Sequence, residues 1–138
     1  MVGILIIAHA KLGESLIHCA SHVLCSRPQR LLHLGVGVQD DPQELLAQAR
    51  DLIAQLDDGD GVLVMSDVFG ATPSNIACKL LVPGRVEGVS GVSLPMLVRA
   101  LTYRNEALKV VVGKAISGGL EGVMQLPIEN CRDATTGS

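Results

Sequence analysis

Short apolar runs alternate with amphipathic segments along the chain. Residues 3–7 and 62–65 are wholly apolar and of strand length, as expected for strands covered on both faces in a parallel sheet. Residues 31–38 form another apolar run, interrupted by His33 and two glycines, and residues 86–92 are a weaker one. The pattern therefore predicts four strands.

Helical spacing of apolar residues fills the intervals between these runs. Residues 12–24 predict an amphipathic helix, and Asp41-Pro42 predicts the start of another that continues to Leu56. Further helices are expected to begin at Pro73 and at Pro95. Residues 108–112 are rich in β-branched side chains, but the apolar residues over 108–116 follow helical spacing, so we predict a helix that ends at Gly118-Gly119.

This alternation predicts an α/β three-layer sandwich. Parallel strands need crossover helices, so the expected architecture is an open, mainly parallel sheet in the order 2-1-3-4 with helices on both faces. A chain of 138 residues has the usual size of one domain. We assign residues 1–130 to that domain and expect residues 131–138 to form a frayed C-terminal tail.

Composition excludes several classes of function. A net charge of −3, with one Tyr, one Phe and no Trp, gives no sign of a nucleic-acid interface. The longest apolar stretch, residues 1–8, is too short to cross a membrane and lacks the features of a signal peptide. We therefore expect a cytoplasmic protein that does not insert into a membrane.

Cysteine usage points to an intracellular fold without disulfides. The four cysteines include no C-x-x-C pair, and a chain this rich in aliphatic residues does not need cross-links to fold. Cys19 and Cys78 fall on predicted core-facing helix positions. Reduced and mostly buried thiols are expected.

Polar side chains with chemical potential follow two strands that the predicted order makes neighbours. His9 ends the first strand, and Ser66-Asp67 ends the third. Ligands of open α/β sheets lie beyond the carboxyl ends of the strands, so an imidazole and a carboxylate are expected to face each other there. A carboxylate that accepts the N–H of one ring nitrogen leaves the other nitrogen free to attack. His9 is thus a candidate nucleophile or base.

The loop after Asp67 has the groups of an anion site. It carries Gly70, the hydroxyl of Thr72 and the first N–H groups of the next helix, which Thr72 is expected to cap. Such a loop suits a phosphoryl group. In the alternative interpretation His9 and Asp67 only make structural hydrogen bonds, and Thr72 is an ordinary helix cap.

His18, His22 and Cys25 support a rival hypothesis from another class. They lie about one helical turn apart, which is acceptable spacing for zinc ligands in a binding module. The same stripe also holds Lys11 and Glu14, and no second ligand cluster is evident. A solvated helix face is therefore the favoured interpretation.

Three motifs together resemble enzyme IIA of the mannose-type (mannose/fructose/sorbose) phosphoenolpyruvate-dependent sugar phosphotransferase system (PTS). They are Ile-Ile-Ala-His at residues 6–9 followed by Leu-Gly-Glu at 12–14, Ser-Asp-Val-Phe-Gly-Ala-Thr-Pro-Ser-Asn at 66–75, and Gly-Val-Ser-Leu-Pro-Met-Leu at 91–97. The motifs stand in the family's order and spacing, and the match runs from residue 1 to about Leu126.

The resemblance implies a phosphotransferase that needs no metal or cofactor. His9 would accept a phosphoryl group from the histidine-containing phosphocarrier protein and pass it to a histidine or cysteine of a IIB partner for sugar uptake. Asp67 would hold the His9 ring. The phosphate site would comprise Ser66, Gly70, Ala71 and Thr72. A homodimer is also implied, in which a short antiparallel fifth strand near residues 123–126 is exchanged between subunits.

The chain departs from the family pattern at a few positions. Ala10 and Ala71 stand where many members have Gly, and Ser74 replaces a common Phe. The two methyl groups bear on the conformation of the phosphate loop, and the lost aromatic ring bears on partner docking. Two related roles stay open: a regulatory protein whose phosphorylation state is read without sugar transport, and the phosphocarrier domain that serves dihydroxyacetone kinase. The 70–75 run fits the mannose type better.

Overall fold

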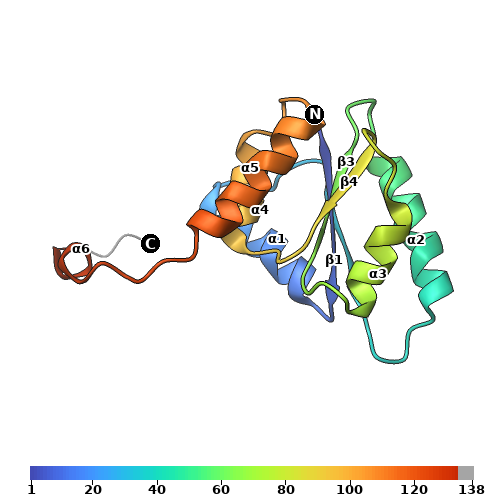
Figure 1. Cartoon of the computed structure of the whole chain (residues 1–138), viewed down its shortest axis with the longest axis horizontal. Helices are drawn as coiled ribbons and strands as arrows, with labels where there is room; N and C mark the ends of the chain where they lie inside the picture. The colour runs from blue at the N-terminus through green and yellow to red at the C-terminus, as the bar shows by residue number, and fades with distance from the viewer. Residues whose placement is uncertain (134–138) are drawn as a thin grey trace.

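The computed structural model describes residues 1–133 and places a parallel sheet between two layers of helices (Figure 1). The four strands are β1 (Gly3–His9), β2 (Leu31–Val36), β3 (Val62–Ser66) and β4 (Val86–Val89). Their order is β2-β1-β3-β4, and every neighbouring pair is parallel. The predicted fold class and strand order are therefore confirmed.

Each face of the sheet packs against its own set of helices (Figure 1). Alternation along β1 sends Ile4 and Ile6 to one hydrophobic cluster and Leu5 and Ile7 to the other. The first cluster lies under α1 (Leu12–Val23), α4 (Leu94–Thr102) and α5 (Leu108–Glu121), and the second under α2 (Pro42–Leu56) and α3 (Thr72–Leu80). Burial on both faces explains why β1 and β3 are apolar up to their last residues, His9 and Ser66.

The start of α2 follows the capping chemistry in the sequence, but the end of α5 differs from its prediction. The Asp41 carboxylate accepts the Gln43 N–H at 3.0 Å, as expected for the cap of α2. α5 continues through Gly118-Gly119 to Glu121, beyond its predicted end. A Cβ at Gly118 would lie 2.8 Å from the Cβ of Arg99, so this glycine permits close packing of α5 on α4.

The predicted burial of the cysteines is wrong. All four are free and exposed, including Cys19 on α1 and Cys78 on α3. α1 buries Gly13, Ile17 and Ala20 instead of the stripe that contains Cys19. A Cβ at Gly13 would lie 3.0 Å from the Cβ of His33, so α1 rests on the sheet through its smallest residue. That close contact turns Cys19 toward solvent.

The C-terminal segment lies apart from the sheet. Residues 122–132 are exposed, and α6 (Ile128–Asp133) projects away from the helical layers (Figure 1). Residues 123–126 form no strand within the single chain, so the exchanged fifth strand stays a prediction. Of the predicted tail, residues 131–133 end α6, and residues 134–138 lie outside the described residues. No helix within residues 1–133 is long and apolar enough to cross a membrane.

Candidate active site

His9 and Asp67 meet at the carboxyl end of the sheet. Their strands are neighbours, with Ile7 of β1 in register with Ser66 of β3. Nδ1 of His9 lies 2.7 Å from Oδ2 of Asp67, and the same oxygen accepts the backbone N–H of His9 at 2.9 Å. The His9 side chain is 53% exposed, whereas that of Asp67 is 9% exposed. A sheltered carboxylate thus holds a ring that is open to solvent.

The electrostatics of this pair fix the position of the ring proton. Desolvation raises the pKa of Asp67, but hydrogen bonds from the His9 backbone, the His9 ring and the Val68 N–H outweigh it, and the net pKa lies below the usual 3.8. Asp67 is therefore ionised at neutral pH and can only accept hydrogen bonds. In the neutral ring Nδ1 must therefore carry the proton, which leaves the lone pair on Nε2.

The turn after β1 holds His9 in place through close backbone contacts. Ala10 has φ +49°, a left-handed conformation that Gly adopts at lower cost. Its N–H donates to the carbonyl of Val36 at 3.0 Å. A Cβ at Gly35 would lie 2.4 Å from the Ala10 carbonyl oxygen, so β2 needs Gly there to let the turn approach.

A cavity of about 370 Å³ lies beside His9. Thr72, at the start of α3, lines it. The rest of its wall comes from the end of β2, the loop that follows and the start of α2, through Val36, Gly37, Val38, Asp40 and Pro42. The predicted capping role of Thr72 is wrong: Ala71 is the N-cap residue, and no side chain caps α3. Thr72 is instead the first helical residue, so its hydroxyl is not used in capping.

The other predicted phosphate-binding residues, Ser66, Gly70 and Ala71, do not line the cavity beside His9. The N–H of Gly70 donates to the hydroxyl of Ser74 at 2.8 Å, and that hydroxyl donates to the Ala71 carbonyl at 3.0 Å. The Gly70 N–H is therefore occupied within the loop. Ser66 lines a separate cavity of about 240 Å³ with Phe69 and Ser74. Of the predicted set, Thr72 alone lines the cavity that contains His9.

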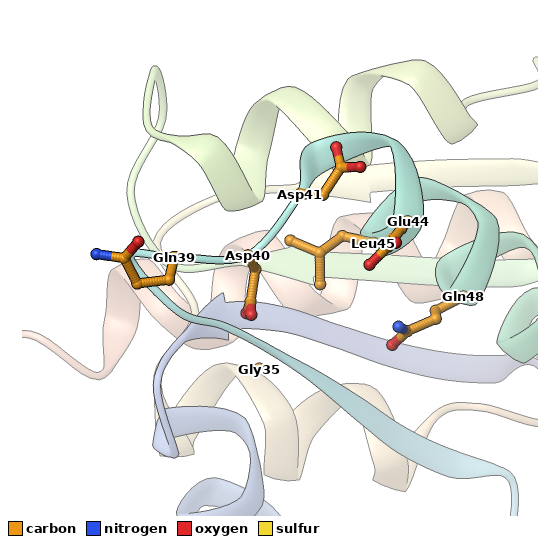
Figure 2. A pocket seen from close by; sticks show the side chains of 7 residues that line it. All are labelled: Gly35, Gln39, Asp40, Asp41, Glu44, Leu45 and Gln48. Atoms are coloured by element: carbon orange, nitrogen blue, oxygen red, sulfur yellow. The ribbon is translucent and has the colours of Figure 1, made fainter.

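The loop between β2 and α2 was missed by sequence reasoning. Asp40 lines both the His9 cavity and an adjacent pocket of about 270 Å³. Figure 2 shows this second pocket, whose other lining residues are Gly35, Gln39, Asp41, Glu44, Leu45 and Gln48. A signal existed: β2 neighbours β1 in the predicted order, so the loop after β2 belongs to the same edge of the sheet.

The zinc hypothesis is wrong. Among residues 1–133, no three His, Cys, Asp or Glu side chains come together in a group that could hold a metal ion. His18 and His22 are exposed on α1, and Cys25 lies beyond the helix end with φ +58°. The left-handed turn interrupts the helical stripe on which the hypothesis depended.

Comparison with known proteins identifies the family. The family described as "PTS system fructose IIA component" (EIIA-man) matches residues 3–115, which contain β1 to α4 and the first half of α5. The chain belongs to this family. PTS IIA components are phosphotransferases that carry a phosphohistidine intermediate, so the predicted family and enzyme class are both confirmed.

Individual relatives agree with this assignment. The mannose-specific EIIAB component of Escherichia coli K12 is 28% identical over 96% of this chain, which covers 43% of that relative's length. The chain thus spans less than half of the curated relatives it matches.

Solved structures share the fold. The PTS component EIIA of Streptococcus agalactiae has a TM-score of 0.80 at 21% identity, covering 91% of this chain and 97% of that one. The mannose/sorbose-specific IIA subunit of Enterococcus faecalis has a TM-score of 0.81 at 16% identity, covering 91% of this chain and 95% of that one. At these identities the likeness bears on the fold alone.

Proposed function

We propose that this chain carries a phosphoryl group on Nε2 of His9 between two protein partners of the PTS. The donor is the histidine-containing phosphocarrier protein and the acceptor is a IIB domain. The observation that carries the proposal is the 2.7 Å contact between His9 Nδ1 and Asp67, because it directs the lone pair of Nε2 away from the carboxylate. Membership of the IIA family supports the same chemistry.

The proposed transfer is an in-line exchange between two nitrogen atoms. The Nε2 lone pair attacks phosphorus, the phosphorus–nitrogen bond of the donor's phosphohistidine breaks, and its electron pair returns to the donor ring. Nδ1 keeps its proton throughout. A ring that bears a proton on Nδ1 and phosphorus on Nε2 carries positive charge, which the Asp67 carboxylate offsets. In the second transfer the acceptor side chain attacks phosphorus, the bond to Nε2 breaks, and its electron pair returns to the His9 ring.

The start of α3 is the proposed binding site for the phosphoryl oxygens. The first N–H groups of a helix have no acceptor within the helix, and its N-terminus carries partial positive charge. The Thr72 hydroxyl lines the His9 cavity and takes no part in capping. Ala71 remains in the proposed site as the N-cap residue of α3. Ser66 and Gly70 contribute by shaping the loop.

The decisive experiment is enzymatic phosphorylation of the purified chain. Incubation with phosphoenolpyruvate, the first enzyme of the system and its phosphocarrier protein is expected to introduce one acid-labile, base-stable phosphate. His9→Ala should remove it completely, because Nε2 is the proposed attacking atom. His18→Ala is the matched control: His18 is also exposed, but it lies on α1 and should leave labelling unchanged. Undiminished labelling of His9→Ala would refute the proposal.

Asp67→Asn tests the orienting role separately. The amide has the size of the carboxylate but cannot neutralise the charged phosphohistidine ring, so transfer should slow by about 10- to 100-fold while the fold persists. Rapid-quench measurement of transfer from the phosphorylated donor gives the rate. An unchanged rate would show that Asp67 does not assist the reaction. Subsequent transfer to a IIB domain, followed by sugar uptake, separates a transport role from a purely regulatory one.

We further propose that the chain acts as a homodimer in the cytoplasm. β4 is one edge of the sheet, and large apolar side chains are exposed from the end of α5 to the start of α6, at Leu120, Val123, Met124, Leu126 and Ile128. Exchange of a strand near residues 123–126 would cover both surfaces. Light scattering of the purified chain should give twice the monomer mass, and Val123→Asp with Leu126→Asp should give the monomer mass. A monomeric wild-type chain at all concentrations would contradict the dimer.

A further inference from the structure

A second carboxylate borders the cavity beside His9. Asp40 lies in the loop between β2 and α2 and lines this cavity together with His9 and Thr72. Its Oδ2 accepts the N–H of Gly37 at 2.6 Å, which fixes the direction of the carboxylate. In Figure 2 the side chain of Asp40 points back toward the strand ends, whereas that of Asp41 points the opposite way. Negative charge is therefore held at the cavity wall.

The charge of Asp40 is not neutralised by a nearby side chain. Within the described part of the chain, the ion pairs of side-chain carboxylates involve Asp57, Asp58, Asp60, Asp67 and Glu121 but not Asp40. Asp67 differs because the His9 ring contacts it directly and shares its charge. A phosphoryl group on Nε2 would share the cavity with the charge of Asp40.

We propose that Asp40 raises the free energy of the phosphorylated form of His9 by electrostatic repulsion and so keeps the phosphoryl group transferable. This inference rests on the proposed function of His9. A phosphoryl group brings nearly two negative charges, and a fixed carboxylate on the wall of the same cavity repels it. Asp40 is exposed, so water and salt screen this repulsion and keep it modest. Thr72 and the α3 N-terminus attract the same group, and a cavity with attraction alone would retain it.

This repulsion explains why a carboxylate, Asp40, would stand beside a site that binds a negatively charged phosphoryl group. A carrier must release its group as readily as it accepts it, so very tight binding of the phosphorylated state would stop transfer to the acceptor. Asp40 acts through space on the phosphoryl group and is thus a positioning and tuning residue. The hydrogen bond that Asp40 accepts from Gly37 stabilises the loop. This structural role can be separated experimentally from the proposed repulsion of the phosphoryl group.

Asp40→Asn removes the charge and keeps an oxygen that can accept the Gly37 N–H. At equilibrium with limiting phosphorylated donor, this variant should shift the ratio of phosphorylated to free chain upward by about three- to tenfold at low salt. Its phosphohistidine should also hydrolyse more slowly after removal of the donor. High salt should reduce the difference from wild type, since it screens the charge. Asp40→Glu, which restores the charge, should return the ratio toward the wild-type value.

Asp41→Asn is the matched control. It removes the same charge one residue away, Asn caps a helix as well as Asp does, and Asp41 does not line the His9 cavity. Its phosphorylation ratio should equal that of wild type. The inference is overturned if Asp40→Asn leaves the ratio unchanged, shifts it no more than Asp41→Asn, or shifts it equally at all salt concentrations. A wild-type chain that takes up no phosphate on His9 overturns the proposed function and this inference together.

Discussion

At the scale of single residues, one carboxylate organises the candidate active site. Asp67 accepts the backbone N–H of His9, the ring N–H of His9 and, through its other oxygen, the N–H of Val68 at 2.9 Å. The first and second of these bonds fix the chain and the ring of the same residue. Asp67 thus sets the position of His9, the direction of its ring and the location of its proton.

The same hydrogen bonds make the stability of the fold depend on pH. Desolvation is outweighed by these bonds, so the pKa of Asp67 in the folded chain lies below the usual 3.8. A lowered pKa means that the ionised carboxylate stabilises the fold above the unfolded value, and that this contribution is lost as pH falls through the folded pKa. Wild type should therefore lose more stability between pH 6 and acid pH than Asp67→Asn, by on the order of 1 kcal/mol. Urea unfolding at each pH measures the difference; parallel pH profiles would contradict it.

The sequence predicted the central pair of the site but not the cavity around it. His9 and Asp67 follow strands whose neighbourhood could be deduced from strand order, so their contact was predictable. Thr72 looked like a helix cap, yet α3 begins one residue earlier than that role requires. Asp40 carries no motif, and its place in the cavity depends on the path of the loop after β2. Loop paths arise from tertiary contacts that local patterns do not encode.

At the scale of elements, the strained turn between β1 and α1 packs against the end of β2. Ala10 sits at φ +49° while its N–H bonds to Val36 and its carbonyl approaches Gly35. The side chain costs about 1–2 kcal/mol in this conformation, and Gly avoids that cost but loses about 0.5–1 kcal/mol in chain entropy. Close packing at glycines also explains two wrong predictions: the buried face of α1, which rests on the sheet at Gly13, and the end of α5, which continues past Gly118.

Replacement of Ala10 by Gly should therefore stabilise the chain slightly. The expected gain in unfolding free energy is about 0.5 kcal/mol, because relief of the left-handed strain exceeds the added entropy cost. Ala54→Gly, an exposed position inside α2, is the control and should lose about 1 kcal/mol. Urea unfolding of both variants measures whether the free energy of unfolding rises in Ala10→Gly and falls in Ala54→Gly. A loss of stability in Ala10→Gly as large as that in Ala54→Gly would contradict the turn geometry.

At the scale of the whole molecule, the carboxyl end of the sheet holds the candidate active site, whereas the amino end is stabilised by a buried arginine. His9 and Asp67 occupy the carboxyl end, where the loops form cavities. The amino end is held by Arg104, which is 5% exposed and follows α4. Its guanidinium donates to the carbonyl oxygens of Val2, Gln29 and Arg30, at 2.8 Å to Val2 and 2.7 Å to Arg30. One side chain thereby joins the beginnings of β1 and β2 to the end of α4.

Arg104→Met should lower the free energy of unfolding without affecting phosphorylation of His9. Desolvation, followed by repulsion from Arg30, lowers the pKa of Arg104 to about 10, so the group is still charged at neutral pH. Loss of its hydrogen bonds removes this donor from the buried carbonyl of Val2 and from that of Gln29, whereas the Arg30 carbonyl keeps the N–H of Ile4, and the change should cost about 2–4 kcal/mol in urea unfolding. Arg85→Met is the control: Arg85 is half exposed and pairs with Asp57, so its loss should cost less than about 1 kcal/mol.

Below the unfolding transition, Arg104→Met should still reach the wild-type extent of phosphorylation, because the guanidinium lies at the opposite end of β1 from His9. Labelling with the phosphorylated donor at low temperature, alongside the urea measurement on the same preparation, checks both halves of this expectation. A variant that keeps its stability would show that the carbonyls of Val2 and Gln29 find water instead. A folded variant that loses phosphorylation would show that the amino end of the sheet is coupled to the site, and the division of tasks between the two ends would then be wrong.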